Sequence, residues 1–310
     1  ARVDEMMHLR TSLHEAHNVQ SGGEEPYQLG ADSLPKAGVP HGRIIKHLDW
    51  PGGPESVYPA VRRDWWVWIP DQYSADHPAN LMVFTDGQTY LSPDGDVRAA
   101  TVLANLISAG ELKPTIGVFI TPGLRDGHPD WPTKRTDDTD GTRSLGFSGL
   151  RDTPQRSFEY DSCTDLYVRF LLEDIVPQVE AEFAVSQDPA DRAIVGISSG
   201  AVAAFVAAWH RPDAFSRVVS HCGSFTNIKG AHNLPWVVRN TAPRKDIVKV
   251  FLQTGRHDLD NVHGSWPLAN REMAAALTFA GYHNKFVFGE GSHSWKHGGA
   301  IFPDTLRWLC

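Results

Sequence analysis

The sequence has few cysteines, no extended basic run and no long apolar run, and each absence excludes a class of function. Its three cysteines, Cys163, Cys222 and Cys310, lie far apart and form no C-x-x-C pair, which disfavours a zinc site built on thiolates. The formal net charge of −8 disfavours binding to nucleic acid, whose phosphates would be repelled. No stretch approaches the roughly 18 uninterrupted apolar residues that a membrane-spanning helix needs.

What remains is the composition of an ordinary globular protein. Of the 310 residues, 41% are hydrophobic and 21% are charged, which supplies enough apolar material for a sizeable core. Single α/β domains reach about 250–300 residues, so we expect one domain over residues 38–310, preceded by an extension over residues 1–37. Oligomeric state is not indicated by the sequence, and the compartment stays open.

Apolar strand-like segments alternate with segments of helical period along most of the chain. Strands are expected at 43–48, 61–69, 81–85, 115–121, 193–197, 218–221, 247–253 and 285–288, and helices at 97–109, 166–183, 199–210, 267–280 and 300–309. This alternation predicts an α/β fold with a mostly parallel sheet and helices on both faces. Because no helix separates the first two strands, they are expected to pair antiparallel.

Residues 122–160 interrupt the alternation with Gly, Pro, Asp, Arg and Thr in no clear period. A loop of this length in a compact domain is usually functional. It follows a buried strand, so it should lie over the carboxyl edge of the sheet, where open α/β sheets bind ligands. We interpret the segment as a lid or pocket loop.

The strongest motif is Gly196-Ile197-Ser198-Ser199-Gly200, which matches G-x-S-x-G. An apolar strand enters the motif and an Ala-rich helix leaves it, as a nucleophile elbow requires. The glycines allow a sharp turn and close approach of strand and helix. The turn would present the Ser198 hydroxyl at a helix N-terminus, where a developing oxyanion is stabilised. Ser198 is therefore the candidate nucleophile.

A serine nucleophile needs a base and an acid, which this elbow arrangement places later in the chain, acid before base. Asp258 follows the strand over 247–253 and is our candidate acid, with Asp260 as the alternative. His293 lies in a Gly-rich loop after the last strand and is the candidate base. His297, nearer the last helix, is the less favoured alternative.

The same logic suggests the remaining site residues. A second backbone donor to the oxyanion should come from the loop after the third strand, where Gln88 is the candidate, beside the N–H of Ser199. Trp295, Trp266 and Tyr90 are candidate substrate contacts, because aromatic faces suit sugar and phenolic groups.

Metal binding has weak support in the sequence. The acidic segment 137–141 faintly resembles a calcium-binding loop but lacks the bidentate Glu at its twelfth position. We therefore interpret the segment as a solvated acidic loop.

Six motifs occur in order along residues 38–310: GVPHG (38–42), VFTDGQTY (83–90), RSFEYDS (156–162), GISSG (196–200), GSFTNIKG (223–230) and GSHSWKHGG (291–299). With them the chain resembles an esterase family that includes enterochelin (enterobactin) esterase, esterase D, and the feruloyl and acetyl-xylan esterases of carbohydrate esterase family one. The resemblance implies an α/β-hydrolase fold and an enzyme that uses neither a metal nor an organic cofactor. Carried onto this sequence, it also implies Ser198 as nucleophile, His293 as base and Asp258 as acid.

The sequence departs from the family at two places. The separate N-terminal domain of enterochelin esterases has no counterpart in these residues, which weakens a siderophore function. The stretch 126–153 is longer than in the relatives, so substrate preference is not carried over. Glu159 and Tyr160 match a family segment without an assigned role.

The leading hypothesis is a serine hydrolase that cleaves feruloyl or acetyl esters of plant polysaccharide through an acyl-enzyme. The expected partner is therefore an ester substrate, and secretion or a periplasmic location would suit that role. Within hydrolases, the alternative substrate is a siderophore lactone or another small ester. An acyltransferase would use the same residues, and a non-catalytic binding module on the same fold is the alternative from another class.

Overall fold

A computed structural model describes residues 25–125 and 154–310. The expected lid loop and the acidic segment 137–141 therefore lie largely outside the described residues. In the described part, no helix is long and apolar enough to cross a membrane.

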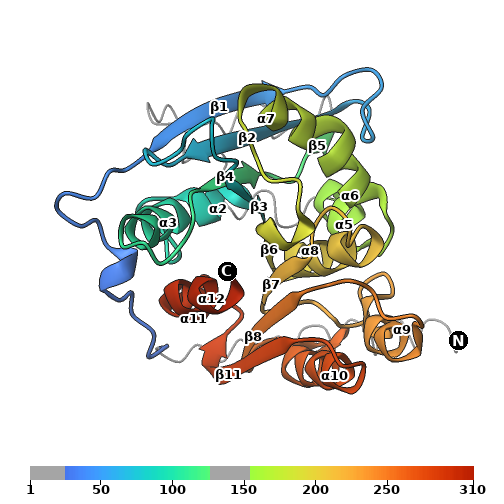
Figure 1. Cartoon of the computed structure of the whole chain (residues 1–310). Coiled ribbons are helices and arrows are strands. Elements are labelled where there is room, and N and C mark those ends of the chain that lie inside the picture. Colours follow the sequence, from blue (N-terminus) through green and yellow to red (C-terminus); the bar gives the residue numbers. More distant parts are fainter. Residues whose placement is uncertain (1–24, 126–153) are drawn as a thin grey trace, which may run out of the picture.

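The core of the molecule is one twisted sheet with the strand order β1-β2-β4-β3-β6-β7-β8-β11 (Figure 1). Its strands are β1 (Arg43–Trp50), β2 (Val61–Ile69), β3 (Asn80–Thr85), β4 (Thr115–Ile120), β6 (Arg192–Ile197), β7 (Arg217–His221), β8 (Lys249–His257) and β11 (Asn284–Ser292), with the short β5 (Leu124–Arg125) against β2. Strand β2 runs antiparallel to β1 and β4, and the strands from β4 to β11 run parallel. The mostly parallel sheet with an antiparallel start is thus confirmed.

Helices cover both faces of the sheet. They are α2 (Gly87–Leu91), α3 (Ala99–Ser108), α5 (Pro154–Asp161), α6 (Leu166–Phe170), α7 (Val176–Glu182), α8 (Ser199–His210), α9 (Leu234–Asn240), α10 (Trp266–Phe279), α11 (Trp295–Ala300) and α12 (Phe302–Leu309). A short hairpin, β9 (Asp260–Asn261) and β10 (Gly264–Ser265), precedes α10.

Successive strand residues point to opposite faces, so the core divides into two clusters. On β2, the buried Trp65 belongs to the cluster beneath α6, α7 and α8, and its neighbour Trp66 belongs to the cluster beneath α3 and α12. Both indoles are fully buried. The aromatic segment over 61–69 is therefore a strand with two buried faces, which explains its uninterrupted hydrophobicity.

Two sequence expectations need correction. The end of the loop expected over residues 122–160 is helical, because α5 begins at Pro154. The single helix expected over 166–183 is α6 followed by a π-helical turn, Leu171–Ile175, and α7, whose start contains Pro177; proline lacks the N–H that an uninterrupted helix needs. The closing helix expected over 300–309 is confirmed as α12, and α11 is an additional short helix that precedes it.

Candidate active site

The segment around Ser198 is a sharp turn between β6 and α8. Ser198 has φ 58° and ψ −127°, a conformation that non-glycine residues rarely adopt. A Cβ on Gly196 would lie 2.1 Å from the carbonyl oxygen of Gly200, and a Cβ on Gly200 would lie 2.3 Å from Thr85 Oγ1. Both glycines are required by these close approaches, and the turn leaves the Ser198 hydroxyl at the start of α8.

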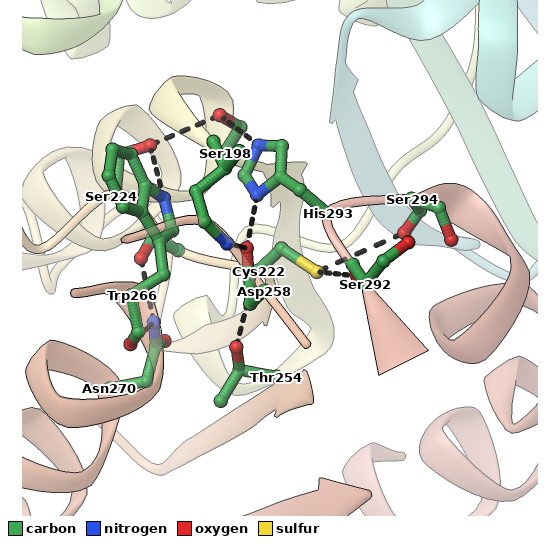
Figure 2. A network of polar contacts seen from close by, with 12 residues as sticks. Ser198, Cys222, Ser224, Thr254, Asp258, Trp266, Asn270, Ser292, His293 and Ser294 are labelled. Atoms are coloured by element: carbon green, nitrogen blue, oxygen red, sulfur yellow. Dashed lines mark hydrogen bonds and ion pairs between the residues drawn. The ribbon is translucent and has the colours of Figure 1, made fainter. Parts of the chain in front are cut away.

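Ser198, His293 and Asp258 form a continuous hydrogen-bonded chain (Figure 2). His293 Nε2 lies 2.9 Å from Ser198 Oγ, and His293 Nδ1 lies 2.6 Å from Asp258 Oδ1. Ser198 follows β6, Asp258 follows β8 and His293 follows β11. The carboxyl ends of parallel strands meet at one edge of the sheet, which is why residues 95 positions apart come into contact.

Asp258 is held as a carboxylate by its surroundings. Burial alone would raise its pKa, but the hydrogen bond and charge of His293, with hydrogen bonds from Thr254 and the Leu259 N–H, outweigh burial and leave the pKa below its ordinary value. Thr254 Oγ1 lies 2.5 Å from Asp258 Oδ2, and Leu259 N lies 2.7 Å from Oδ1. An ionised carboxylate accepts only, so His293 Nδ1 carries the proton and Nε2 is free to accept from Ser198.

The alternative acid and base from the sequence lie elsewhere. Asp260 is exposed in the β9–β10 hairpin, opposite Ser265. His297 is buried, with Nδ1 2.9 Å from Gln253 Nε2 and its ring stacked on Tyr27 at 4.0 Å. The structure brings Asp258 and His293, and neither alternative, to Ser198.

The candidate oxyanion donors lie at the starts of two adjacent helices. Gln88 is the second residue of α2 and Ser199 is the first of α8, in first turns whose N–H groups have no partner within the helix. Strands β3 and β6, which lead into these helices, are neighbours in the sheet. A Cβ on Gly87 would lie 2.2 Å from Ile120 N, so only glycine lets the loop after β3 fold this tightly.

Helix α5, which sequence reasoning missed, binds the loop after β3, in which the candidate oxyanion donor Gln88 lies. Arg156 donates from Nε and Nη2 to the two carboxylate oxygens of Asp86 at 2.9 and 2.8 Å. The Asp86 N–H donates to Tyr160 Oη at 3.2 Å, from the next turn of α5. Asp86 itself has φ 49° and immediately precedes α2. These hydrogen bonds between α5 and Asp86 form a clamp that holds the strained residue at the start of the loop that carries Gln88.

Glu159, whose role the sequence left open, is structural. It forms a buried bidentate ion pair with Arg63 of β2, with distances of 2.8 and 3.0 Å. Gln155 Nε2 adds a hydrogen bond at 2.9 Å. This pair ties α5 to the sheet and so supports the clamp on Asp86.

Removing the arginine of the clamp is expected to destabilise the protein strongly. Arg156→Met leaves the buried Asp86 carboxylate without its bidentate partner, a change that costs about 3–5 kcal/mol in buried pairs. Urea unfolding measures the effect. The matched control is Arg211→Met, because Arg211 also binds Asp213 with two nitrogens but both side chains are exposed; its loss should stay within about 1 kcal/mol. If both variants lost only a small free energy of unfolding, the ion pair between Arg156 and Asp86 would not stabilise the protein.

A strap formed by residues 25–27 holds the loop that carries His293. The Glu25 carboxylate accepts hydrogen bonds from Ser292 Oγ and Ser294 Oγ, the residues on either side of His293. Tyr27 Oη accepts from the Glu290 N–H at 2.8 Å, and its ring stacks on His297. Nothing in the sequence links these distant residues, and the strap restrains the candidate base from outside the sheet.

The three aromatic residues expected to bind substrate are all buried. Tyr90 is fully buried, packs edge-on to Trp295 and lies 3.1 Å through its hydroxyl from His221 Nδ1. Trp295 belongs to the same core cluster. Trp266 packs edge-on to His293 and is 2% exposed. In this structure the three side chains pack against their neighbours, and the substrate contact expected from the sequence stays a prediction.

Cys222, Asp258 and His293 form a group, found among the described residues, whose ligand atoms lie within 4.8 Å of one another. The donor set suits hydrogen bonding better than metal binding. Burial, followed by the charge of Asp258, raises the pKa of the Cys222 thiol well above its ordinary value and so disfavours the thiolate that a metal prefers. Asp258 and His293 already bind each other.

Two buried histidines make the fold sensitive to acid. Burial, and the nearby charge of His297, lowers the pKa of His221 to about 3; burial lowers the pKa of His297 to about 4. An unfolded histidine titrates near about 6.5, so below that pH the unfolded state binds protons that the folded state excludes. The free energy of unfolding is therefore highest above a pH of about 6.5, where the histidines are neutral in both states, and it falls as the pH falls towards 4.

We therefore expect the free energy of unfolding to fall by about 2 kcal/mol for each of these histidines between pH 7.5 and pH 5. Urea unfolding at the two pH values measures it. In His297→Gln the decrease in the free energy of unfolding between the two pH values should be smaller by about 2 kcal/mol, the contribution of one histidine. An unchanged loss in that variant would show that His297 does not titrate in this way.

The chain is similar in sequence and in fold to known esterases. A family model described as "Putative esterase" matches residues 60–309. The iron(III) enterobactin esterase of Dickeya dadantii (strain 3937) is 26% identical over 261 residues, which make up 78% of this chain and 51% of that protein. The chain thus spans about half the length of this curated relative.

Solved structures share the fold. An enterobactin esterase from Shigella flexneri, crystallised in the presence of enterobactin, has a TM-score of 0.67 at 18% identity, with 92% of this chain and 62% of that chain covered. A ferulic acid esterase from the anaerobic fungus Anaeromyces mucronatus has a TM-score of 0.61 at 16% identity, with 91% and 97% covered. These similarities confirm the α/β-hydrolase fold expected from the sequence.

Proposed function

The chain belongs to this esterase family, and from that premise we propose that it hydrolyses carboxylic esters with Ser198 as nucleophile, His293 as general base and Asp258 as the acid that orients the base. The observation that carries the proposal is the unbroken hydrogen-bonded chain from Asp258 through His293 to Ser198 Oγ. Nucleophile, base and orienting acid within hydrogen-bond reach are the signature of covalent catalysis.

In the first half of the reaction, His293 Nε2 takes the proton of Ser198 Oγ as that oxygen attacks the ester carbonyl. The N–H groups of Gln88 and Ser199 stabilise the oxyanion of the tetrahedral intermediate. Collapse breaks the bond to the leaving alcohol, which takes the proton from His293 and leaves an acyl-enzyme. The charge of Asp258 stabilises the imidazolium formed in between.

In the second half, His293 deprotonates a water molecule that adds to the acyl carbonyl. The second tetrahedral intermediate collapses by breaking the bond between the acyl carbon and Ser198 Oγ. Ser198 recovers its proton from His293, and the carboxylic acid leaves. An acyltransferase would differ only in using an alcohol in place of this water.

We propose feruloyl or acetyl esters of plant polysaccharide as the substrate class. In support, the fold shared with the Anaeromyces ferulic acid esterase extends over 97% of that chain. The sequence similarity to the Dickeya enterobactin esterase favours a siderophore lactone as the second candidate. The proposed organisation is an extension over residues 1–37 and a catalytic domain over 38–310.

Initial rates on p-nitrophenyl acetate, p-nitrophenyl butyrate, methyl ferulate and a cyclic trilactone of N-acylserine test the proposal and rank the substrates. An activated phosphonate ester should also inactivate the enzyme and label a single serine, which peptide mapping should identify as Ser198. If the protein binds acylated oligosaccharide but turns over none of the four esters and resists the phosphonate, it is a binding module and the esterase proposal fails.

A further inference from the structure

Ser198 has a second hydrogen-bond partner that the acid–base chain does not use. Ser224 Oγ lies 3.1 Å from Ser198 Oγ, and Trp266 Nε1 lies 3.1 Å from Ser224 Oγ (Figure 2). Ser224 comes from the loop after β7, and Trp266 begins α10. Both side chains are buried, with 0% and 2% exposure.

The direction of this chain of hydrogen bonds is fixed at both ends. The indole Nε1–H of Trp266 can only donate, so Ser224 Oγ accepts from it. Ser198 has one proton, which it donates to His293 Nε2. The remaining contact therefore requires the Ser224 hydroxyl to donate to Ser198 Oγ.

Ser224 is held firmly enough to act as a preorganised donor. Its backbone N–H donates to the Ser198 carbonyl oxygen at 3.1 Å. The buried Asn270 Nδ2 donates to the carbonyl oxygens of Gly223 and Trp266 at 2.8 and 2.9 Å, which joins the Ser224 loop to α10. A donor fixed in this way needs no reorganisation when charge develops on its acceptor.

We propose that Ser224 is a catalytic hydrogen-bond donor to Ser198 Oγ that speeds deacylation, and that Trp266 is the residue that positions it. The inference rests on the proposed esterase function, and it gives Ser224 a role in the deacylation step of that reaction. In the acyl-enzyme, Ser198 Oγ is an ester oxygen and a weak acceptor. As the second tetrahedral intermediate collapses, the electron pair of the breaking C–O bond returns to Oγ, and the donated hydrogen bond strengthens until His293 supplies the proton.

The effect should be larger on deacylation than on acylation. Before acylation, Oγ is a hydroxyl oxygen that already accepts a good hydrogen bond from Ser224, so less is gained on reaching the transition state. Only interactions that strengthen between ground state and transition state accelerate a step. Loss of Ser224 should therefore make the acyl-enzyme accumulate.

The test is the pre-steady-state burst of p-nitrophenol from p-nitrophenyl acetate. In Ser224→Ala we expect steady-state kcat to fall on the order of 10- to 100-fold, as for loss of one hydrogen bond to a charged group. The burst amplitude should stay near one per active site, and its rate should fall much less. A variant that loses burst rate and kcat equally, or that retains wild-type kcat, overturns the proposal.

Trp266→Phe keeps a six-membered aromatic ring near His293 and removes the indole N–H together with the five-membered ring that carries it. We expect a smaller fall in kcat than for Ser224→Ala, again with the burst retained. Because Trp266 acts through Ser224, the double variant should be no slower than Ser224→Ala alone. A double variant in which the two losses multiply would show that Trp266 acts independently of Ser224.

Matched controls are Trp236→Phe, which changes an indole that is 67% exposed on α9, and Ser186→Ala, whose hydroxyl binds Asp191 far from Ser198 in the fold. Both should keep the wild-type burst and kcat. Melting temperatures of all variants show whether they fold. If wild type itself is inactive, the esterase function fails; if wild type is active and Ser224→Ala is unaltered, only the role of Ser224 fails.

Discussion

Ser198→Ala is expected to lower kcat on p-nitrophenyl acetate by at least about 10⁴-fold, because it removes the hydroxyl that forms the acyl-enzyme. The substitution removes one oxygen and leaves His293, Asp258 and the candidate oxyanion donors in place. Any residual rate would come from binding and oxyanion stabilisation alone. Initial rates against wild type, with the uncatalysed rate subtracted, measure the effect.

The variant should remain folded, because alanine adds no atom to the tight turn and Gly196 and Gly200 are unchanged. It should also resist labelling by the activated phosphonate. A Ser198→Ala protein that keeps more than a small fraction of the wild-type rate would rule out Ser198 as nucleophile, whatever the geometry around it.

The second large effect is expected for Asp258→Asn. The amide has nearly the shape of the carboxylate but no negative charge, so it does not stabilise the imidazolium of His293. Its NH₂ group can also donate to Nδ1, which favours the tautomer with the proton on Nε2. In a comparable triad this loss is about 10⁴-fold in kcat. We expect a loss of about 10³- to 10⁴-fold here, with a smaller change in KM.

The chain offers a matched control two residues away. Asp260 is the rival acid in the sequence, but it is exposed in the β9–β10 hairpin. Asp260→Asn should keep the rate within about two-fold, since surface substitutions away from a site have small effects. If the two variants exchanged these outcomes, Asp260 would be the acid and the position of Asp258 in this structure would not be the one used in catalysis.

The residues at strand ends could be predicted from sequence because their signals are local. Ser198 lies between two glycines that the turn demands, and Asp258 and His293 follow strands recognisable from apolar runs. Parallel topology then brings strand ends to one edge without further information. The alternation of strands and helices could be predicted for the same reason, because apolar runs and helical periodicity are local patterns.

What could not be predicted depends on contacts between distant segments. Arg156 meets Asp86 across 70 residues, and Glu25 meets Ser294 across 269, and no local pattern encodes either pairing. The burial of Tyr90 could not be predicted either, because aromatic residues in loop motifs occur both in cores and in pockets. Ser224 has no distinguishing sequence signal beyond its family motif.

The strap of Glu25 and Tyr27 separates the loss of activity from the loss of the fold. Proteins open locally with free energies from near zero up to the global value, and polar, partly exposed segments lie at the low end. The strap is such a segment, and the buried sheet is at the other extreme. Opening of the strap would remove the common partner of Ser292 and Ser294 and free the loop of His293 while the core stays intact. We therefore expect activity to be lost before the fold, so that residual activity would not measure the fraction of molecules that remain folded.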